Sequence, residues 1–372
     1  MNFLIITHVQ HKKNGDFFAA YEPYVREMNL WFNYVDKVTV VAPLINESVS
    51  PIDLNYKHEN IKFHAISSIQ FTTLKNTLVS IFKIPQILTS IFRACKKADH
   101  IHLRCPGNIG LLGCLIQICF PKKIKTAKYA GNWDPKSKQP LSYRFQKCIL
   151  SNTFLTKKIN VLVYGDWKNQ TKNIKSFFTA TYKKSEIDTS IIRNYDNKLK
   201  FVFVGSLVKG KRPFLSIKIV EKLYQKNKNV SLDIYGDGIL KKELQDYINK
   251  NNLNDYIIIH GNQKKDIIKQ ALKASHFLIL PSVSEGWPKA IAEAMFFGVI
   301  PIATKISCVP FMLDQGKRGV LIGPDLERAT QKIKKSLEDQ KRLELMSSRA
   351  IEWSQQYTLD VFESEIVKLL KP

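Results

Sequence analysis

FLILPSVSEGWPKAIAEAMFFGVIPIAT, residues 277–304, is the stretch that decides the fold. It opens with a run that is apolar on both faces, Phe277–Leu280, and then turns at Glu285-Gly286. A helical pattern follows over Pro288–Phe297, Gly298 is suited to a helix stop, and a second apolar run occupies Val299–Thr304. A strand, a helix and a strand in this order predict a parallel sheet that is covered by helices.

The same alternation extends outward in both directions, as expected for doubly wound α/β sheets. In the second half we predict further strands at Phe201–Val204, Ser231–Tyr235 and Tyr256–His260, and helices at Pro213–Gln225, Leu240–Asn251 and Lys264–Ala274. In the first half we predict strands at Phe3–Thr7, Lys37–Val41, Ile61–Ala65, His100–Arg104, Ile124–Tyr129 and Ile159–Tyr164, and helices that include Phe17–Trp31 and Pro106–Phe120.

The polar stretch Ser185–Lys200 contains the predicted linker, residues 186–200. It would separate an N-terminal domain, 1–185, from a C-terminal domain, 201–354, and a C-terminal helix within 355–372 is expected to complete the first domain. Ligands of open α/β sheets bind at the carboxyl ends of the strands. We therefore predict two facing Rossmann-like domains with parallel sheets and a ligand cleft between them.

Composition narrows the class of protein. The 372 residues are 44% hydrophobic and 24% charged, which excludes global disorder. The longest mostly apolar run, Ile109–Phe120, is too short to span a bilayer, the first residues lack a basic leader, and no CxxC pair is present. We expect a cytoplasmic protein with neither a disulfide framework nor a metal site.

The charge is unusually positive, at +25, and is concentrated in the first half. Residues 1–200 hold 30 basic and 13 acidic side chains, and the block 101–160 holds 11 basic side chains and one acid, Asp134. Such a field favours an anionic partner, such as a membrane surface or a phosphorylated substrate. A lysine-rich proteome would account equally well for the total, although less well for the clustering.

Two carboxylates flank the expected start of the helix that follows Glu285-Gly286. Free N–H groups of Trp287, Lys289 and Ala290, on either side of Pro288, would make an anion site at the positive end of the helix dipole. Glu285 lies in the turn before this helix and Glu293 on its second turn. Carboxylates beside an anion site suit hydroxyl donors such as those of sugars and ribose. The alternative is that Glu285 is a surface loop glutamate and Glu293 a helix-capping glutamate.

The string from Glu285 through Glu293 and Gly298 to Pro301 resembles the Glu-x7-Glu signature of family 4 glycosyltransferases, which are retaining enzymes with two Rossmann domains (the GT-B fold). The similarity extends in order over about residues 198–325. The resemblance implies that Glu293 hydrogen-bonds the ribose of a nucleotide-sugar donor and that Glu285 contacts hydroxyls of the donor sugar.

A second match to the family follows the strand at Phe201. The family pattern places an Arg directly after Gly205 and a Lys five residues later, and both neutralise the donor diphosphate. Lys211 keeps its place here, but Ser206 stands where the family has Arg. Arg212 or Lys209 could replace the missing charge, and a solvated loop lysine is the alternative reading of Lys211.

The resemblance also assigns weaker positions. Gly236 and Gly238 resemble the loop beside the donor nucleotide, Gly261 and Asn262 resemble the base-contacting loop, and Gly15 resembles a flexible loop between donor phosphate and acceptor. A plain tight turn explains Gly236-Asp237-Gly238 equally well, and Asp16 is preferred as a helix cap. Many relatives carry a His after the strand at Ile124; here Asn132 and Asp134 are acceptor-site candidates, with a salt-bridged structural role as the alternative for Asp134.

Residues 71–97 mix apolar side chains with five Lys or Arg and no acid, and Pro85 is expected to break them into two helices. A basic amphipathic pair would suit the inner face of an anionic membrane, and a pair of helices covering the core is slightly preferred.

These observations predict a retaining, metal-independent glycosyltransferase that moves a sugar from a UDP- or GDP-linked donor to a hydroxyl acceptor, either a glycan or a lipid-linked sugar. No Asp-x-Asp motif is present to hold a metal, and we expect no cofactor and no nucleic-acid partner. The setting would be surface polysaccharide or glycoconjugate assembly. The rivals are an enzyme like a nucleotide-sugar 2-epimerase and a basic membrane-surface module without transferase activity.

Overall fold

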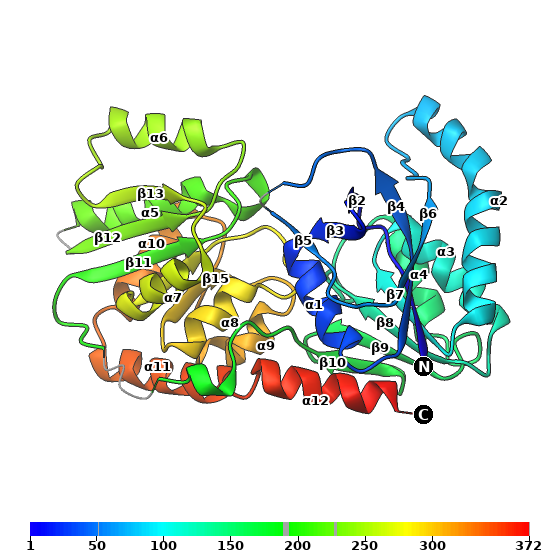
Figure 1. Cartoon of the computed structure of the whole chain (residues 1–372). Helices are drawn as coiled ribbons and strands as arrows, with labels where there is room; N and C mark the ends of the chain where they lie inside the picture. Colours follow the sequence, from blue (N-terminus) through cyan, green and yellow to red (C-terminus); the bar gives the residue numbers. More distant parts are fainter. Residues whose placement is uncertain (51, 189–192, 227–228, 372) are drawn as a thin grey trace. The chain divides into compact units, whose positions relative to one another are not determined.

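The computed structural model describes residues 1–50, 52–188, 193–226 and 229–371, which form two α/β units (Figure 1). Unit 1 comprises Met1–Phe177 and Glu363–Pro372, and unit 2 comprises Phe178–Phe362. The chain thus crosses between the units twice, at 177/178 and at 362/363. The second crossing lies inside the last helix, α12 (Leu359–Leu370).

Unit 1 is built on a parallel sheet with antiparallel strands added beyond β4. Its strands are β1 (Asn2–Ile6), β2 (His11–Asn14), β3 (Phe17–Tyr21), β4 (Lys37–Ile45), β5 (Asp53–Asn55), β6 (Ile61–Ile66), β7 (His100–Cys105), β8 (Ile124–Tyr129), β9 (Ile159–Tyr164) and β10 (Ile174–Phe177). Its helices are α1 (Glu22–Phe32), α2 (Leu74–Lys97), α3 (Asn108–Ile116) and α4 (Leu141–Ser151), with a 3-10 turn at Gln117–Cys119. The parallel strands run in the order β10-β9-β8-β7-β1-β4-β6.

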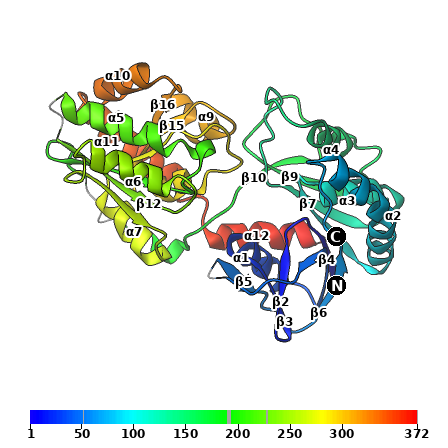
Figure 2. The same cartoon turned by 90° about the horizontal axis from the view of Figure 1, so that it is seen from above.

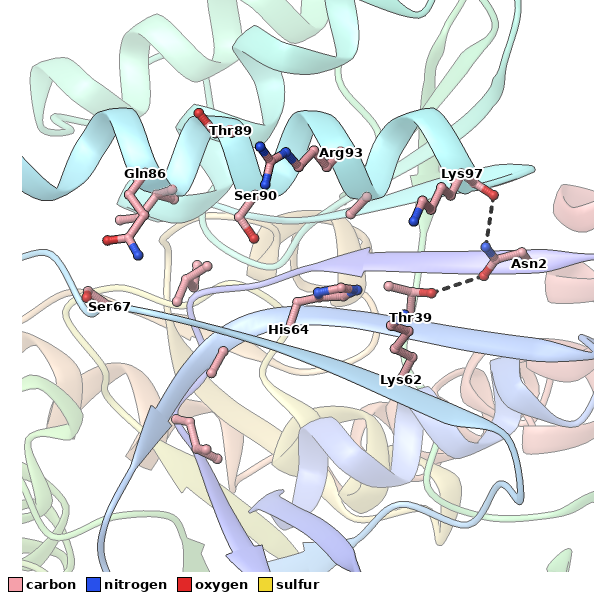
Figure 3. A pocket seen from close by; sticks show the side chains of 15 residues that line it. Asn2, Thr39, Lys62, His64, Ser67, Gln86, Thr89, Ser90, Arg93 and Lys97 are labelled. Atoms are coloured by element: carbon pink, nitrogen blue, oxygen red, sulfur yellow. Dashed lines mark hydrogen bonds between the residues drawn. The ribbon is translucent and has the colours of Figure 1, made fainter.

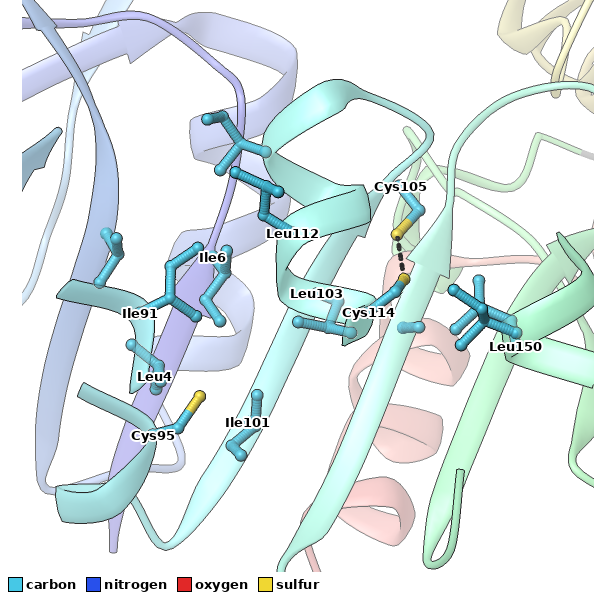
Figure 4. Packing of buried hydrophobic residues seen from close by; sticks show 14 of the residues in the cluster. Leu4, Ile6, Ile91, Cys95, Ile101, Leu103, Cys105, Leu112, Cys114 and Leu150 are labelled. Carbon is cyan, nitrogen blue, oxygen red and sulfur yellow. Dashed lines mark hydrogen bonds between the residues drawn. The ribbon is translucent and has the colours of Figure 1, made fainter. Parts of the chain in front are cut away.

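Helices cover both faces of this sheet because alternate residues of each strand point to opposite sides. Leu4 and Ile6 of β1 belong to a core with buried side chains of α2, α3 and α4, which Figure 4 shows from close by. Phe3, the residue before Leu4, points to the other face and stacks on Trp31 of α1 at 5.6 Å between ring centroids. Runs that are apolar on both faces are what a strand covered on both sides requires.

Unit 2 repeats the arrangement with six parallel strands. They are β11 (Leu199–Val204), β12 (Val230–Tyr235), β13 (Ile257–Gly261), β14 (Phe277–Leu280), β15 (Ile300–Thr304) and β16 (Val320–Ile322). The helices are α5 (Pro213–Gln225), α6 (Lys241–Lys250), α7 (Lys265–Ala274), α8 (Lys289–Phe296), α9 (Val309–Met312), α10 (Leu326–Ser336) and α11 (Gln340–Ser354), with 3-10 turns at Lys184–Glu186, Lys209–Lys211 and Asp314–Gly316. The first residues of α12, up to Phe362, also belong to unit 2, and the rest of that helix belongs to unit 1. The predicted α/β class with parallel, Rossmann-like sheets is confirmed.

The predicted helix at 17–31 is wrong in its first turn. Residues Phe17–Tyr21 form β3, which pairs antiparallel with β2 across a turn at Gly15-Asp16 and with β5 on its other side (Figure 2). The helix α1 begins only at Glu22, where Pro23 fits the first turn. Asp16 therefore lies in a hairpin turn and caps no helix.

Pro85 does not break the segment 71–97 as predicted. A single helix, α2, runs from Leu74 to Lys97 with Pro85 inside it. Proline removes one backbone donor from a helix, and the turns after it are held in the core by Ile87, Ile91 and Cys95. By length and composition α2 is the one helix of the described ranges that is apolar enough to cross a membrane, and 28% of its most apolar window is buried.

The predicted linker 186–200 is attached to unit 2. The Glu186 carboxylate pairs with Lys269 at 2.9 Å, and Asp188 pairs with Lys273 at 2.6 Å, both on α7. Arg193 donates to the backbone carbonyl oxygen of Ser275 at 2.8 Å. Residues 189–192 of the predicted linker lie outside the described residues. The Glu186 and Asp188 carboxylates of this segment therefore form ion pairs within unit 2. The chain crosses from unit 1 to unit 2 earlier, at 177/178.

Candidate functional site

The strand order of unit 2 places its candidate site. The order is β13-β12-β11-β14-β15-β16, so successive strands are added outward on one side of β11 and then on the other. The loops after β11 and β14 leave the carboxyl ends of the two strands where the order reverses. Such a topological switch point is where open α/β sheets bind ligands.

Glycines let the loops at this edge approach one another closely. The Gly205 N–H donates to the Tyr235 carbonyl oxygen at 3.0 Å, and the Gly236 N–H donates to the Gly261 carbonyl oxygen at 2.9 Å. A Cβ at Gly236 would lie 1.9 Å from the Gly205 carbonyl oxygen, and a Cβ at Gly238 would lie 2.6 Å from that of Leu207. Backbone packing therefore requires Gly236 and Gly238, whatever ligand binds beside them.

Two predicted residues meet across the switch point. Lys211, from the 3-10 turn after β11, donates from Nζ to Oε1 of Glu285 in the loop after β14 at 2.6 Å. The Glu285 side chain is 8% exposed and that of Lys211 is 30% exposed. An ion pair this short between partly buried groups fixes where both side chains lie. The two sequence motifs thus form one site in space.

Hydrogen bonds to backbone groups hold the two loops that carry this ion pair. The Val283 N–H donates to the Gly210 carbonyl oxygen at 2.8 Å, which ties the two loops together. The Glu285 N–H donates to Ser307 Oγ at 3.3 Å, and Cys308 Sγ donates to the Gly286 carbonyl oxygen at 2.9 Å. Burial raises the pKa of the Cys308 thiol to about 12, so this thiol stays protonated and serves as a donor. The Glu285 loop is therefore preorganised.

The remaining predicted donor residues lie around this pair or further along α8. Arg212 has the left-handed backbone, φ 51°, and directly precedes Pro213 at the start of α5. Ser206 and Asn262 are exposed at the ends of the loops after β11 and β13. The Trp287 indole packs against Trp353 and Tyr357.

Helix α8 starts one residue later than the sequence predicts. Pro288 is the N-cap, and the first helical bond is donated by Ile291 to the Pro288 carbonyl oxygen at 2.9 Å. The N–H groups of Lys289 and Ala290 precede that bond and have no partner within the helix. Glu293, on the second turn, accepts a hydrogen bond from the Thr181 hydroxyl through Oε1 at 2.6 Å.

In unit 1 the predicted acceptor residues close a turn after β8. Asn132 Oδ1 accepts from the Asp134 N–H at 2.9 Å, and Asp134 Oδ1 accepts from the Lys136 N–H at 2.8 Å. Lys147 lies over the Trp133 ring at 5.3 Å, and burial lowers the pKa of its ammonium to about 8 against the opposing effect of Asp134. Gly15 lies in the β2–β3 turn with φ 58°, which glycine adopts readily.

Sequence reasoning missed the switch point of unit 1, which lies between β1 and β7. A cavity of about 260 Å³ opens there, and among its lining residues are His8, Gln10, Ser68, Asn108 and Tyr143. A Cβ at Gly107 would lie 2.6 Å from His8 Nδ1, so Gly107 is required for the imidazole to fit. Burial, aided by the Arg104 charge, lowers the pKa of His8. The Pro106-Gly107-Asn108 turn signal directly after β7 could have identified this site.

Among the described residues no group of three or more His, Cys, Asp or Glu side chains is placed to hold a metal ion. Positive charge at the unit 2 site comes instead from Lys211, Arg212 and the N-terminus of α8. The arrangement can bind an anion beside carboxylates that accept from hydroxyl groups.

Residues 184–353 match the family model described as glycosyl transferases group 1. An uncharacterized glycosyltransferase of Methanocaldococcus jannaschii is 28% identical over 172 residues, which cover 45% of this chain and 42% of the relative. Protein CapJ of Staphylococcus aureus is 25% identical, with 74% and 72% covered. The Escherichia coli UDP-Gal:alpha-D-GlcNAc-diphosphoundecaprenol alpha-1,3-galactosyltransferase is 29% identical, with 35% and 34% covered. The matched stretch thus spans less than half of the first relative and about a third of the last.

Solved structures match over the whole chain. A glycosyltransferase from Rickettsia africae superposes with a TM-score of 0.67 at 15% identity, covering 100% of this chain and 98% of that one. Anabaena HepE, solved in complex with UDP and glucose, gives a TM-score of 0.63 at 15% identity, covering 99% and 98%. At such identities the likeness concerns the fold. Residues 184–353 therefore match a glycosyl transferases group 1 domain, in a chain with the α/β fold of GT-B glycosyltransferases.

Proposed function

We propose that the protein is a retaining, metal-independent glycosyltransferase that moves a sugar from a nucleotide-diphosphate sugar, UDP- or GDP-linked, to a hydroxyl acceptor. The observation that carries the proposal is the contact between Lys211 and Glu285 across the unit 2 switch point. It joins a cation suited to a diphosphate and a carboxylate suited to sugar hydroxyls within one site.

The donor site works through charge. An ammonium carries three donors, so Lys211 can keep one on Glu285 and direct another to a phosphate oxygen. The N–H groups at the start of α8 add a second source of positive potential. Together they would stabilise the charge that develops on a leaving diphosphate, with no metal required. Arg212 or Lys209 is proposed to supply the charge that Ser206 lacks.

Glu293 is assigned to the ribose. Its Oε1 accepts from Thr181, and a carboxylate has capacity for further donors. Ribose hydroxyls would supply them. The retaining outcome is proposed from the resemblance of the Glu285–Glu293 string to family 4 enzymes, in which the acceptor hydroxyl attacks the face that the diphosphate leaves and no enzyme nucleophile is needed.

The acceptor is assigned to unit 1, with Asn132 and Asp134 and the polar cavity around His8 as its candidate contacts. A glycan or lipid-linked sugar is proposed because one curated relative acts, by its name, on a diphosphoundecaprenol-linked sugar. Peripheral attachment to an anionic membrane is proposed for the same unit. Leu74, Leu78, Ile81 and Phe82 are between 50% and 86% exposed along one stripe of α2, with lysines beside them.

The test uses the whole chain with a panel of UDP- and GDP-sugars and simple glycoside acceptors. We expect one donor to be consumed in excess EDTA, and proton NMR of the product to show the anomeric configuration of the donor. Glu293→Ala should weaken nucleotide binding by about ten- to a hundredfold, since it leaves buried hydroxyls unpaired at roughly 1–3 kcal/mol. The exposed Glu338 provides the matched control, Glu338→Ala.

Each contrary result has a distinct meaning. Inversion at the anomeric carbon would refute the retaining mechanism, and activity that depends on added magnesium or manganese would refute the metal-free one. Release of a 2-epimeric sugar without transfer would favour the epimerase alternative. Binding to vesicles containing phosphatidylglycerol without turnover of any donor would favour a membrane module.

A further inference from the structure

A second cavity in unit 1 is distinct from the cavity around His8, with which it shares no lining residue. It has a volume of about 870 Å³ and lies between α2 and the strands β4 and β6 (Figure 3). Pockets that bind small molecules commonly have volumes of about 300–1,000 Å³. We call it the α2 groove, defined by the facing side chains of α2 and of β6, of which Arg93, Lys97, Lys62 and His64 carry the argument.

The α2 groove is lined by positive charge without negative charge. Lys62 and His64 come from β6, two residues apart and hence on one face of the strand, while Arg93 and Lys97 come from α2, one turn apart. None of the residues that line it is Asp or Glu. Within the described ranges, Lys62, Arg93 and Lys97 have no carboxylate within 4.0 Å.

This clustering of like charge is weakly unfavourable, because Lys62, Arg93 and Lys97 are exposed and solvent screens their repulsion. Like charges one turn apart on a helix repel each other. Lys97 is at the carboxyl end of α2, where the helix dipole favours a cation, but Arg93 lies beyond that effect. Burial, and to a smaller extent the charges of Lys62 and Lys97, lowers the pKa of His64. An anion in the groove would remove this repulsion.

The rest of the lining indicates what the anion is attached to. Ser67, Gln86 and Ser90 offer hydroxyl and amide groups further along the groove, and Figure 3 shows the α2 side chains facing those of the strands. Guanidinium groups pair with phosphate oxygens through two parallel hydrogen bonds, and hydroxyl and amide groups suit a polyol. We infer that the α2 groove is a binding site for a phosphate ester of a polyol, separate from the sugar-donor site of unit 2.

Two sources share this chemistry: the headgroup of an anionic phospholipid and a soluble polyol phosphate. The probes are therefore glycerol 3-phosphate, inorganic phosphate, and vesicles of phosphatidylglycerol or of phosphatidylcholine. Affinity is measured by calorimetry or vesicle flotation, and occupancy by the NMR titration of His64, whose pKa should rise when a phosphate binds beside it.

The decisive variant is Arg93→Gln with Lys97→Gln, and the matched control is Lys75→Gln with Lys96→Gln. The control removes the same charge from exposed positions of the same helix that do not line the groove. We expect the groove variant to weaken binding of glycerol 3-phosphate by about tenfold for each charge removed, and the control to change it less than twofold.

Both sources remain distinguishable. Loss of phosphatidylglycerol binding in the groove variant, with weak binding of the soluble ester, identifies the headgroup, and the reverse identifies the soluble ester. The proposal is overturned if none of the probes binds, if both double variants weaken binding equally, or if the His64 titration is unchanged at saturation. None of these readouts depends on glycosyl transfer.

Discussion

Lys211 and Glu285 show how two side chains from distant parts of the sequence make one site. The sequence alone could place each at the end of a strand, and the resemblance could assign each a role, but neither could pair them. Their 2.6 Å contact depends on β11 and β14 being neighbours in the sheet. It also gives each residue a structural role that has to be separated from its chemical one.

A double-mutant cycle separates these roles. Lys211→Met leaves the Glu285 carboxylate without its cation, and we expect the free energy of unfolding to fall by about 1–3 kcal/mol. In Lys211→Met with Glu285→Gln no unpaired charge remains, so most of that stability should return. Nucleotide binding should stay at least tenfold weaker in both variants, because the diphosphate has lost its cation.

The measurements are urea denaturation and calorimetric titration with UDP and GDP. Equal destabilisation by the single and double variants would show that the ion pair does not determine the stability of the loop. Nucleotide affinity that recovers together with stability would remove Lys211 from the donor site.

The prediction of a helix or strand succeeded where the apolar periodicity of a segment and its length indicated the same element. The ranges Phe277–Leu280, Ile124–Tyr129 and Pro213–Gln225 are the same in sequence and structure, because a buried strand and an amphipathic helix differ clearly in apolar period. The helix predicted over Phe17–Tyr21 was wrong because a hairpin strand and a helical turn both tolerate the apolar residues of this segment. The helix break predicted at Pro85 was wrong because the packing of Ile87 and Ile91 outweighs the loss of one backbone hydrogen-bond donor.

The sequence predicted only part of the candidate site, because local patterns do not show which distant segments become neighbours. Loops at strand ends are visible in sequence, so Lys211 and Glu285 could be proposed. The cavity around His8 gathers residues from the loops after β1, β6 and β7 and from β4, α3 and α4, and no local pattern brings these together. Likewise, nothing local to residue 293 indicates that Thr181 donates to it.

Helix α12 provides a test of how its packing contributes to stability. Ile366 is fully buried, whereas Val361 on the same helix is 40% exposed. Ile366→Ala deletes buried methyl groups and leaves a cavity, so we expect a loss of about 2–5 kcal/mol. Val361→Ala should change the free energy of unfolding by less than about 0.5 kcal/mol. Thermal denaturation of both variants measures the difference in stability. Similar losses of unfolding free energy in the two variants would mean that α12 packs loosely along its whole length.

The chain as a whole contains several neutral histidines in the interior of unit 1. Burial lowers the pKa of His11 and of His100 to about 4, and that of His102 well below its usual range. His100 and His102 share the Thr126 hydroxyl, at 2.9 and 2.8 Å. A neutral imidazole pair can share one hydroxyl that donates to one ring and accepts from the other.

We therefore predict that stability falls as the pH is lowered from about 6.5 towards 4. In that window an unfolded chain protonates these histidines and the folded chain does not, so acid favours unfolding. Each such residue contributes up to about 1.4 kcal/mol per pH unit. Urea denaturation between pH 7.5 and 5 measures the slope, and NMR titration checks that His11 and His100 stay neutral above pH 5. A flat stability profile over this range would contradict the prediction.

The double crossing between the units has a consequence for synthesis on the ribosome. Unit 2 is continuous, Phe178–Phe362, and its first and last residues are in contact, with ring centroids 5.6 Å apart. Unit 1 begins at the first residue but takes Glu363–Pro372 from the other end of the chain. The portion made first must therefore wait for the portion made last, while unit 2 is already complete. Nascent unit 1 spends the whole translation of unit 2 without the helix that finishes it, and its buried apolar surface is exposed to chaperones during that interval.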